Sequence, residues 1–433
     1  MTGRHAIILA AMCLTLVHAS AKTMDGAGPP NTVDLPAVLR LVRDASPRLA
    51  AEREEIAQAE AERITAGAYP NPTLSYNRAV PGGGVSGTQF TGIRQEQTTV
   101  ELPLLFPGQY SARIGKAERE IEAARARVAS GATSLAAEAG SAYIALLAAQ
   151  EKAALLTGAT EELARFRQVV AGRQSSGVAS QYDLARMDVE AAGFSSREAE
   201  ARADVAEASG KLAALLGLKN WRPRASGNLS PQLLAAAIPA RPALDLAMDS
   251  PAVVAATREQ DAAQASVTVA RRERWPNVSV VLGRSWTTNP FGASDFFGLS
   301  VELPIFDTRR GPLAKAESEA RAATLRKELA TAEAASGLDS LANAIASRQS
   351  ALKRFEDDAA SRLPALRQMA EDNYRLRGGS ILELLDATRS RFDLENTRID
   401  LVANLVESQL NFLAISGNLE SSIGQPAAEG VKR

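Results

Sequence analysis

Cysteine and histidine are almost missing from this chain, which has one cysteine, Cys13, and two histidines, His5 and His18. All three lie in a short stretch at the N-terminus that we expect to be removed. A chain without them has no Ser-His-Asp or Cys-His nucleophile, no thiolate or imidazole metal site and no disulfide. We therefore expect no enzymatic activity, no catalytic or metal site and no cofactor.

The N-terminal stretch has the pattern of a secretory signal peptide. Arg4 precedes an apolar run over residues 6–17, and the small residues at 19–21 predict cleavage after residue 21, so that 1–21 is the signal peptide. The run is shorter than the ~20 residues that span a bilayer. Cys13 lies inside the run and does not follow a small residue, so we expect no lipid anchor.

The chain also has almost no net charge and few aromatic residues. The chain carries 49 Lys and Arg against 50 Asp and Glu, so no basic patch predicts a nucleic-acid partner. Aromatic residues make up 5% of the chain, while Ala, Glu, Arg and Leu dominate, a bias typical of long helices. We see no second apolar run of transmembrane length, so insertion into a membrane would use strands.

No proline occurs between Pro107 and Pro223, which predicts a very long helix over about 108–174. At ~1.5 Å per residue such a helix is roughly 100 Å long, so it must pack lengthwise against other helices. Apolar residues recur along it at every seventh position, the spacing of a coiled-coil seam. They are Ile114, Ile121, Val128, Leu135, Ala142, Ala149, Leu156, Leu163 and Val170.

The second half of the chain repeats this organisation. Ser46-Pro47 is matched by Ser250-Pro251, and Glu101-Leu102-Pro103 by Glu302-Leu303-Pro304, at nearly the same spacing. Such a long repeat indicates duplication of a whole unit. We expect a first repeat over 34–218 with a second helix at 181–217, a polar surface connector at 219–242, a second repeat over 243–417 with helices at about 311–374 and 381–417, and a tail at 418–433.

Two details refine the second long helix. Its seam comprises Leu338, Ile345, Leu352, Ala359 and Leu366. Pro364 falls in the middle of the expected helix and should kink it, because proline removes a backbone hydrogen bond.

Four segments alternate apolar and polar residues with the period of a strand. They are about 73–80, 97–103, 277–286 and 296–304. Apolar residues on one face and polar residues on the other are typical of a lipid-facing barrel, although Arg78 falls on the apolar face. Four strands cannot close a barrel, and an open edge is untenable in lipid, so several protomers would each donate four strands. Two small soluble hairpins remain an alternative.

The layout resembles the TolC-like outer-membrane factor family of outer membrane efflux proteins, over about 34–417. The residues that carry the resemblance are Tyr69-Pro70-Asn71-Pro72, Leu102-Pro103, Leu303-Pro304 and the turn sequences at 177–184 and 379–386. It implies a mainly α fold with a β-barrel contribution: a trimer with a twelve-stranded barrel in the outer membrane, a long helical tunnel in the periplasm and an equatorial collar formed partly by 219–242.

The resemblance also implies partners. A homotrimer would export small molecules or metal ions together with a periplasmic adaptor protein and an inner-membrane transporter, and the heavy-metal branch is the nearest by eye. The helical tips would dock the adaptor through Gly177, Val178, Ser180, Asp183, Gly378, Gly379, Ser380 and Glu383.

Charged residues near the tips form a candidate periplasmic gate, since opposite charges could latch the helices as a network. They are Asp183, Arg186, Glu371, Asp372, Arg375 and Arg377. Arg377 stands where related tips carry a glycine.

Other functions remain open. A periplasmic adaptor also uses long helical hairpins, but would need a compact β-rich domain. A type I secretion duct would share this architecture. An enzyme with paired carboxylates or a cell-wall scaffold would not require four alternating segments. Nothing in the chain could select a metal, because the soft donors left after cleavage are Met24, Met187, Met248 and Met369.

Overall fold

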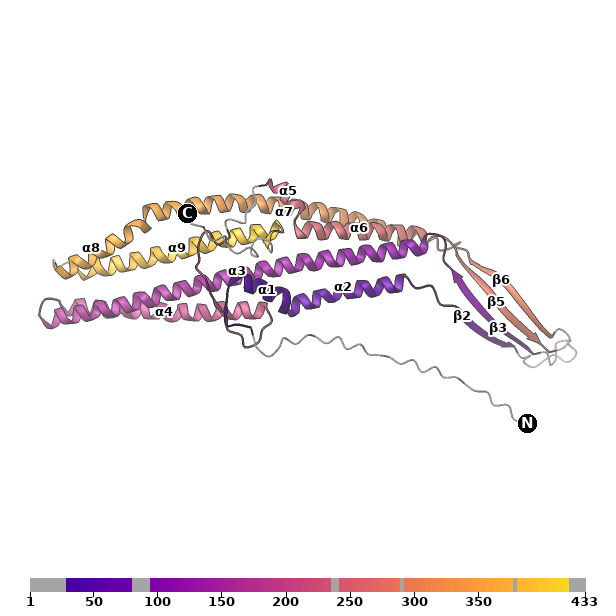
Figure 1. Cartoon of the computed structure of the whole chain (residues 1–433), viewed down its shortest axis with the longest axis horizontal. Coiled ribbons are helices and arrows are strands. Elements are labelled where there is room, and N and C mark those ends of the chain that lie inside the picture. The colour runs from indigo at the N-terminus through magenta and orange to yellow at the C-terminus, as the bar shows by residue number, and fades with distance from the viewer. Residues whose placement is uncertain (1–28, 80–93, 235–240, 289–291, 377–379, 420–433) are drawn as a thin grey trace, which may run out of the picture.

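The computed structural model describes residues 29–79, 94–234, 241–288, 292–376 and 380–419. They form a long rod with a four-stranded sheet at one end and two helical tips at the other (Figure 1). The expected signal peptide, nearly all of the tail and tip residues Arg377, Gly378 and Gly379 lie outside these ranges.

Each repeat contributes shorter helices that flank a long one. The first holds α1 (Leu35–Ala45), α2 (Pro47–Ala66), α3 (Gln109–Ser175) and α4 (Gln181–Leu215). The second holds α5 (Ala243–Met248), α6 (Pro251–Arg272), α7 (Arg310–Asp358), α8 (Leu363–Leu376) and α9 (Ile381–Ile415). The matched Ser-Pro pairs start α2 and α6, where the missing proline N–H has no helical partner to lose.

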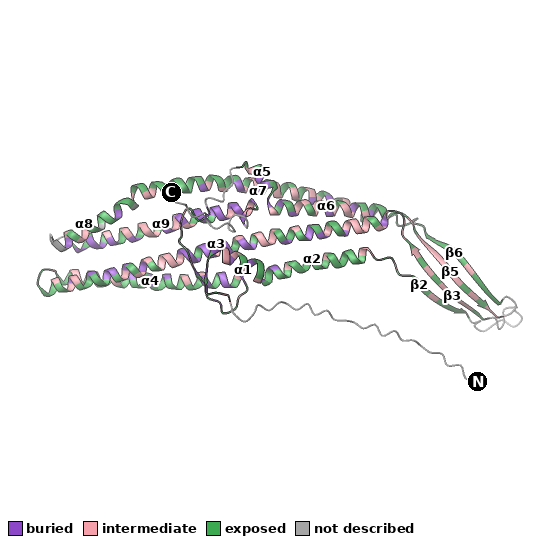
Figure 2. Cartoon of the chain, viewed as in Figure 1, coloured by how far each residue is buried: buried purple, intermediate pink, exposed green. Residues whose placement is uncertain are grey.

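The seam of α3 is the core of the bundle. Ile121, Val128, Leu135, Leu156, Leu163 and Val170 are buried, and the three remaining seam positions are half-buried. Because α3 packs against α2, α4, α6 and α9, it is the axis of the rod (Figures 1 and 2).

By length and composition α3 is the one helix in the described part of the chain that could cross a bilayer. It contains an 18-residue window of mean hydropathy 1.3, half of which is buried inside the chain. No second apolar run of this length was expected from the sequence. Its surroundings are other helices of the bundle, so the window belongs to the core.

The expected single helix at 311–374 is wrong. α7 ends at Asp358, a short 3₁₀ turn covers Ala360–Arg362, and α8 begins at Leu363. Pro364 is the second residue of α8, a position that tolerates a missing N–H, so the chain breaks before the proline rather than bending around it.

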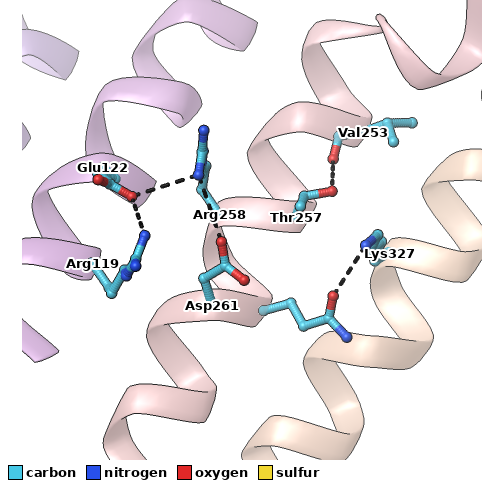
Figure 3. A network of polar contacts seen from close by, with 8 residues as sticks. Arg119, Glu122, Val253, Thr257, Arg258, Asp261 and Lys327 are labelled. Atoms are coloured by element: carbon cyan, nitrogen blue, oxygen red, sulfur yellow. Dashed lines mark hydrogen bonds and ion pairs between the residues drawn. The ribbon is translucent and has the colours of Figure 1, made fainter.

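Polar contacts also hold the repeats together outside the core. Arg258 of α6 lies 3.6 Å from Glu122 of α3, which in turn pairs with Arg119 at 3.0 Å (Figure 3). On the other side of α6, Gln260 accepts a hydrogen bond from Lys327 of α7 at 3.2 Å. Helix α6 therefore bridges the long helices of both repeats.

The sheet is antiparallel, with β2 (Thr73–Ala79), β3 (Gln95–Leu104), β5 (Asn277–Thr287) and β6 (Gly292–Glu302) in the order β2-β3-β5-β6. The central pair β3 and β5 joins the two repeats, whereas β2 and β6 are its edges. In this sheet each repeat supplies one inner and one outer strand.

The connector is not the polar surface segment that the sequence suggested. Trp221, Leu229 and Leu234 are buried in the central core. A two-residue strand, β4 (Arg224–Ala225), pairs in parallel with β1 (Thr32–Val33). The apolar residues scattered among its prolines and polar residues dock on α3, which a segment of mixed composition does not reveal.

Side chains of α3 hold the connector in place. The Tyr143 hydroxyl donates to the Ser226 carbonyl at 2.5 Å. The Gln150 side chain both accepts from Ala225 N and donates to Ala225 O, each at 2.9 Å. These contacts tie the connector to the first repeat at mid-rod.

Candidate functional site

One face of the sheet is apolar and uncovered. The cross-strand row Leu74, Val100, Leu282 and Phe297 lies on it, and Leu74 and Phe297 are 71% and 77% exposed. Two further rows continue it toward the helices: Leu102, Val280 and Leu299, then Leu104, Val278 and Val301. Large apolar groups in contiguous exposed rows mark a surface made for lipid or for another chain.

Two ion pairs interrupt this face near the hairpin loops. The Arg284 guanidinium binds both carboxylate oxygens of Asp295, at 2.6 and 2.9 Å, directly across the β5–β6 ladder. Arg78 lies 3.4 Å from Glu96 across the β2–β3 ladder. The arginine that fitted the apolar pattern poorly is thus neutralised by its cross-strand neighbour.

Aromatic residues stand at both ends of the apolar rows. Trp286 lies beside the ion pairs, while Trp275, 54% exposed, stacks on Phe106 at the helix end with ring centroids 5.6 Å apart. At ~3.3 Å per residue and a tilt of ~40°, the chain from Trp275 to Trp286 rises about 28 Å. That height is close to the ~25 Å apolar band of an outer-membrane barrel, which aromatic girdles flank.

The first tip is a tight turn between α3 and α4. Gly177 has φ +76°, and the N–H groups of Val178 and Ala179 return to the Arg173 carbonyl at 2.9 and 3.2 Å. Ser180 and Asp183 then form a reciprocal capping box at the start of α4. Val178 is left 65% exposed at the apex.

The second tip is described from Ser380 onward. The Ser380 hydroxyl accepts from Leu382 N at 3.2 Å and so caps α9. Glu383 accepts a hydrogen bond from the Asn373 side chain at 3.0 Å, which links α9 to α8. Ser380 and Glu383 therefore serve the tip's own structure.

The structure shows individual surroundings for the candidate gate residues that it describes. The Asp183 carboxylate is used by its own helix cap, and Arg186 Nε is buried without a hydrogen-bond partner in the described ranges. Glu371 is half-buried and Asp372 exposed on α8. The Arg375 side chain and Arg377 lie outside the described residues, so the latch stays a hypothesis.

A contact that the sequence analysis missed joins the two tips. Arg173 of α3 donates to the Tyr374 carbonyl of α8 at 2.8 Å, and its guanidinium lies 4.9 Å from the centre of the Tyr374 ring. Burial raises the pKa of the Tyr374 hydroxyl. No feature of a single sequence pairs Tyr374 with Arg173.

Two ion pairs with buried carboxylates were missed for the same reason. Arg391 of α9 pairs with Glu162 of α3, and Arg389 of α9 pairs with Glu190 of α4. Both glutamates are buried, although charged residues on a helix usually read as a solvated face. Helix α9 is therefore pinned to the α3–α4 hairpin.

The chain, which carries an apolar sheet on a helical rod, matches known proteins both in sequence and in structure. A sequence model described as "Outer membrane efflux protein" matches residues 38–218 and 245–418, which is most of the chain in two parts. The chain belongs to the outer membrane efflux protein family. It is accordingly an outer-membrane efflux protein. The alternative that the chain is a periplasmic adaptor is wrong.

Curated relatives of this outer membrane efflux protein include heavy-metal resistance proteins. The cobalt-zinc-cadmium resistance protein CzcC of Cupriavidus metallidurans is 32% identical over 305 residues, 68% of each chain. The nickel-cobalt-cadmium resistance protein NccC of Alcaligenes xylosoxydans xylosoxydans is 30% identical over 330 residues, 74% of this chain and 71% of that one.

Solved structures of low sequence identity show the same fold. The CusC structure superposes with a TM-score of 0.74 at 18% identity, covering 94% of this chain and 96% of that chain. The outer-membrane channel OprN gives 0.74 at 21% identity, covering 89% and 90%. The single chain of the efflux protein therefore has the mainly helical fold of these channels, as its resemblance to the TolC-like family implied.

Proposed function

We propose that three copies of this efflux protein assemble into a continuous channel that exports metal cations across the outer membrane. The observation that carries the proposal is the four-stranded sheet, with its apolar face uncovered and its two edge strands unpaired. Lipid tolerates such a sheet only when the edges of neighbouring copies close it into a barrel. Strand β6 of one copy would then pair with β2 of the next, giving twelve strands.

The helical rod would continue the bore into the periplasm. α3 is 67 residues long, so at ~1.5 Å per residue it measures about 100 Å. Three such bundles around the barrel axis would form a tunnel with the tips at its far end. The tips, with Val178 and Tyr182 exposed at 65% and 64%, would dock the periplasmic adaptor of a tripartite pump.

Metal cations are proposed as cargo because the curated relatives are resistance proteins for cobalt, zinc, nickel and cadmium. No group of three or more potential metal-ligating residues occurs in the described part of the chain. Choice among metals would accordingly lie with the inner-membrane transporter, and we propose no enzymatic activity for this subunit.

The experiment has two readouts. The first is a denaturing gel of the outer-membrane fraction, run with and without heating, on which we expect a trimer that dissociates when heated. The second is the metal tolerance of a host whose own subunit is deleted, which the wild-type chain should restore. A water-soluble monomer would refute the channel, and a trimer that restores no metal tolerance would refute the cargo.

A further inference from the structure

The sheet separates its charges by face. Its acidic and basic side chains are Arg78, Glu96, Glu101, Arg284, Asp295 and Glu302. The register places Arg78, Glu96, Arg284 and Asp295 on the apolar face, where they form two neutral ion pairs. Glu101 and Glu302 lie on the opposite, polar face, with Val281 and Asn277 as their respective β5 partners.

Within the described strands, the two polar-face carboxylates share their face with no cation. Neither glutamate forms an ion pair with a described residue. Glu302 accepts a hydrogen bond from the neutral Asn277 side chain at 2.8 Å, which leaves its charge in place. Glu101 is half-buried and Glu302 exposed.

At the helix end of the sheet, Arg272 and Arg274 precede β5, and Arg309 and Arg310 follow β6 beyond the strands, with Arg309 3.9 Å from Glu273. The hairpin end adds no further charge to the polar face. By sequence, residues 80–93 and 288–291 contain no acidic or basic side chain. Arg94 lies directly before β3 and two residues before Glu96. Because alternate residues of a strand share a face, Arg94 continues the apolar face. The polar face is otherwise mostly serine, threonine, asparagine and glutamine.

We infer that Glu101 and Glu302 make the lumen of the barrel selective for cations. This inference rests on the proposed trimeric barrel, in which the polar face lines the water-filled bore. The four described strands of each copy then add two carboxylates and no cation to the wall. Rings of carboxylates in a low-dielectric pore concentrate cations and repel anions, so a metal ion leaving the tunnel meets a favourable potential at the membrane.

The test is the reversal potential of purified trimers in planar bilayers under a potassium chloride gradient. The wild type should favour potassium over chloride. The double substitution Glu101→Gln with Glu302→Gln, which keeps shape and hydrogen-bonding capacity, should lower the cation-to-anion permeability ratio by at least about twofold. Glu101→Lys with Glu302→Lys should favour chloride.

Glu96→Gln is the matched control, because Glu96 lies on the same strand as Glu101 but on the apolar face. It should leave the permeability ratio unchanged. An unchanged ratio in the double glutamine variant, or an equal fall in the Glu96 control, would overturn the inference.

A closed tip would block the current and mask the selectivity of the barrel. Each measurement is therefore repeated in the Arg173→Ala background, which removes the contact between the tips. Heat-dissociable trimers on a gel show that each variant is assembled. If neither background conducts, the channel proposal fails. If both conduct with a permeability ratio indifferent to the two glutamates, only the selectivity inference fails.

Discussion

The two long helical segments share sequence but differ in continuity. Leu163-Ala164 in α3 corresponds to Leu363-Pro364 at the start of α8, and both pairs are followed by an Arg-Gln dipeptide at the same spacing. α3 runs unbroken through this point, whereas the second repeat breaks just before it. Ala164 is exposed, so a backbone effect of proline rather than packing separates the two repeats.

The break changes how each tip is held. Phe166 on α3 is 7% exposed, but its counterpart Leu366 on α8 is 57% exposed. Helix α9 remains fastened to the first hairpin through Glu162 and Glu190. The comparison teaches that α3, α4 and α9 form one anchored unit, to which α8 is joined by its packing on α9 and by the Arg173–Tyr374 contact (Figure 1).

The largest effect on stability is expected when the Glu162–Arg391 ion pair, which anchors α9 to α3, is removed. Glu162→Ala leaves Arg391 without its partner in a largely buried position, which should lower the free energy of unfolding by about 3–5 kcal/mol. Thermal unfolding followed by circular dichroism in detergent measures it. Glu356→Ala, which breaks the exposed pair with Arg398, is the control and should cost about 1 kcal/mol or less. Equal effects would mean that α9 is not anchored.

Exchanging the proline tests the origin of the break. Ala164→Pro should interrupt α3 and cost about 3 kcal/mol, because it deletes a hydrogen bond inside a helix. The reverse change, Pro364→Ala, should let α7 run into α8. Spin labels at the exposed positions Leu325 and Met369 would then lie farther apart by electron paramagnetic resonance. Tolerance of proline at 164 would show that packing, not proline, sets the break.

The hydrogen bond from Tyr143 of α3 to the connector predicts that the stability of the protein depends on pH. Burial raises the pKa of Tyr143 to about 12 from 10.0, with the charge of Asp34 adding to the shift. Folding therefore favours the neutral hydroxyl: its stabilisation is complete below pH 10 and is lost between pH 10 and 12, an effect on the order of 2 kcal/mol. Tyr143→Phe should flatten the stability profile in that window. An identical profile in both proteins would contradict the assignment.

The smallest effect is expected where α8 meets α3. Arg173→Ala removes the hydrogen bond and the cation–π contact to Tyr374, which together contribute about 1 kcal/mol. Single-channel conductance in planar bilayers should rise, because α8 loses its hold on the anchored unit. Arg165→Ala, at an exposed position on the same helix, serves as the control. No change in conductance would argue against a tip contact that restrains the entrance.

Local sequence patterns predicted much of the architecture. Heptad spacing, matched motifs and alternating segments were enough to place α3, the turn between α3 and α4, and the four strands near their observed positions. The same patterns left three things wrong or unseen: the break before Pro364, the burial of Trp221 in the connector, and the contacts of Arg173, Arg389 and Arg391.

The sequence by itself determined the periodic elements, because helix and strand periods are properties of neighbouring residues and survive without any partner. It also determined the two-faced character of the strands. Only the tertiary structure decided which charges are buried and paired, since Glu162 and Arg391 are far apart in the chain and meet only when α9 packs on α3. It likewise decided that Glu101 and Glu302 share a face free of arginine, because strand register brings β3 and β6 into one sheet.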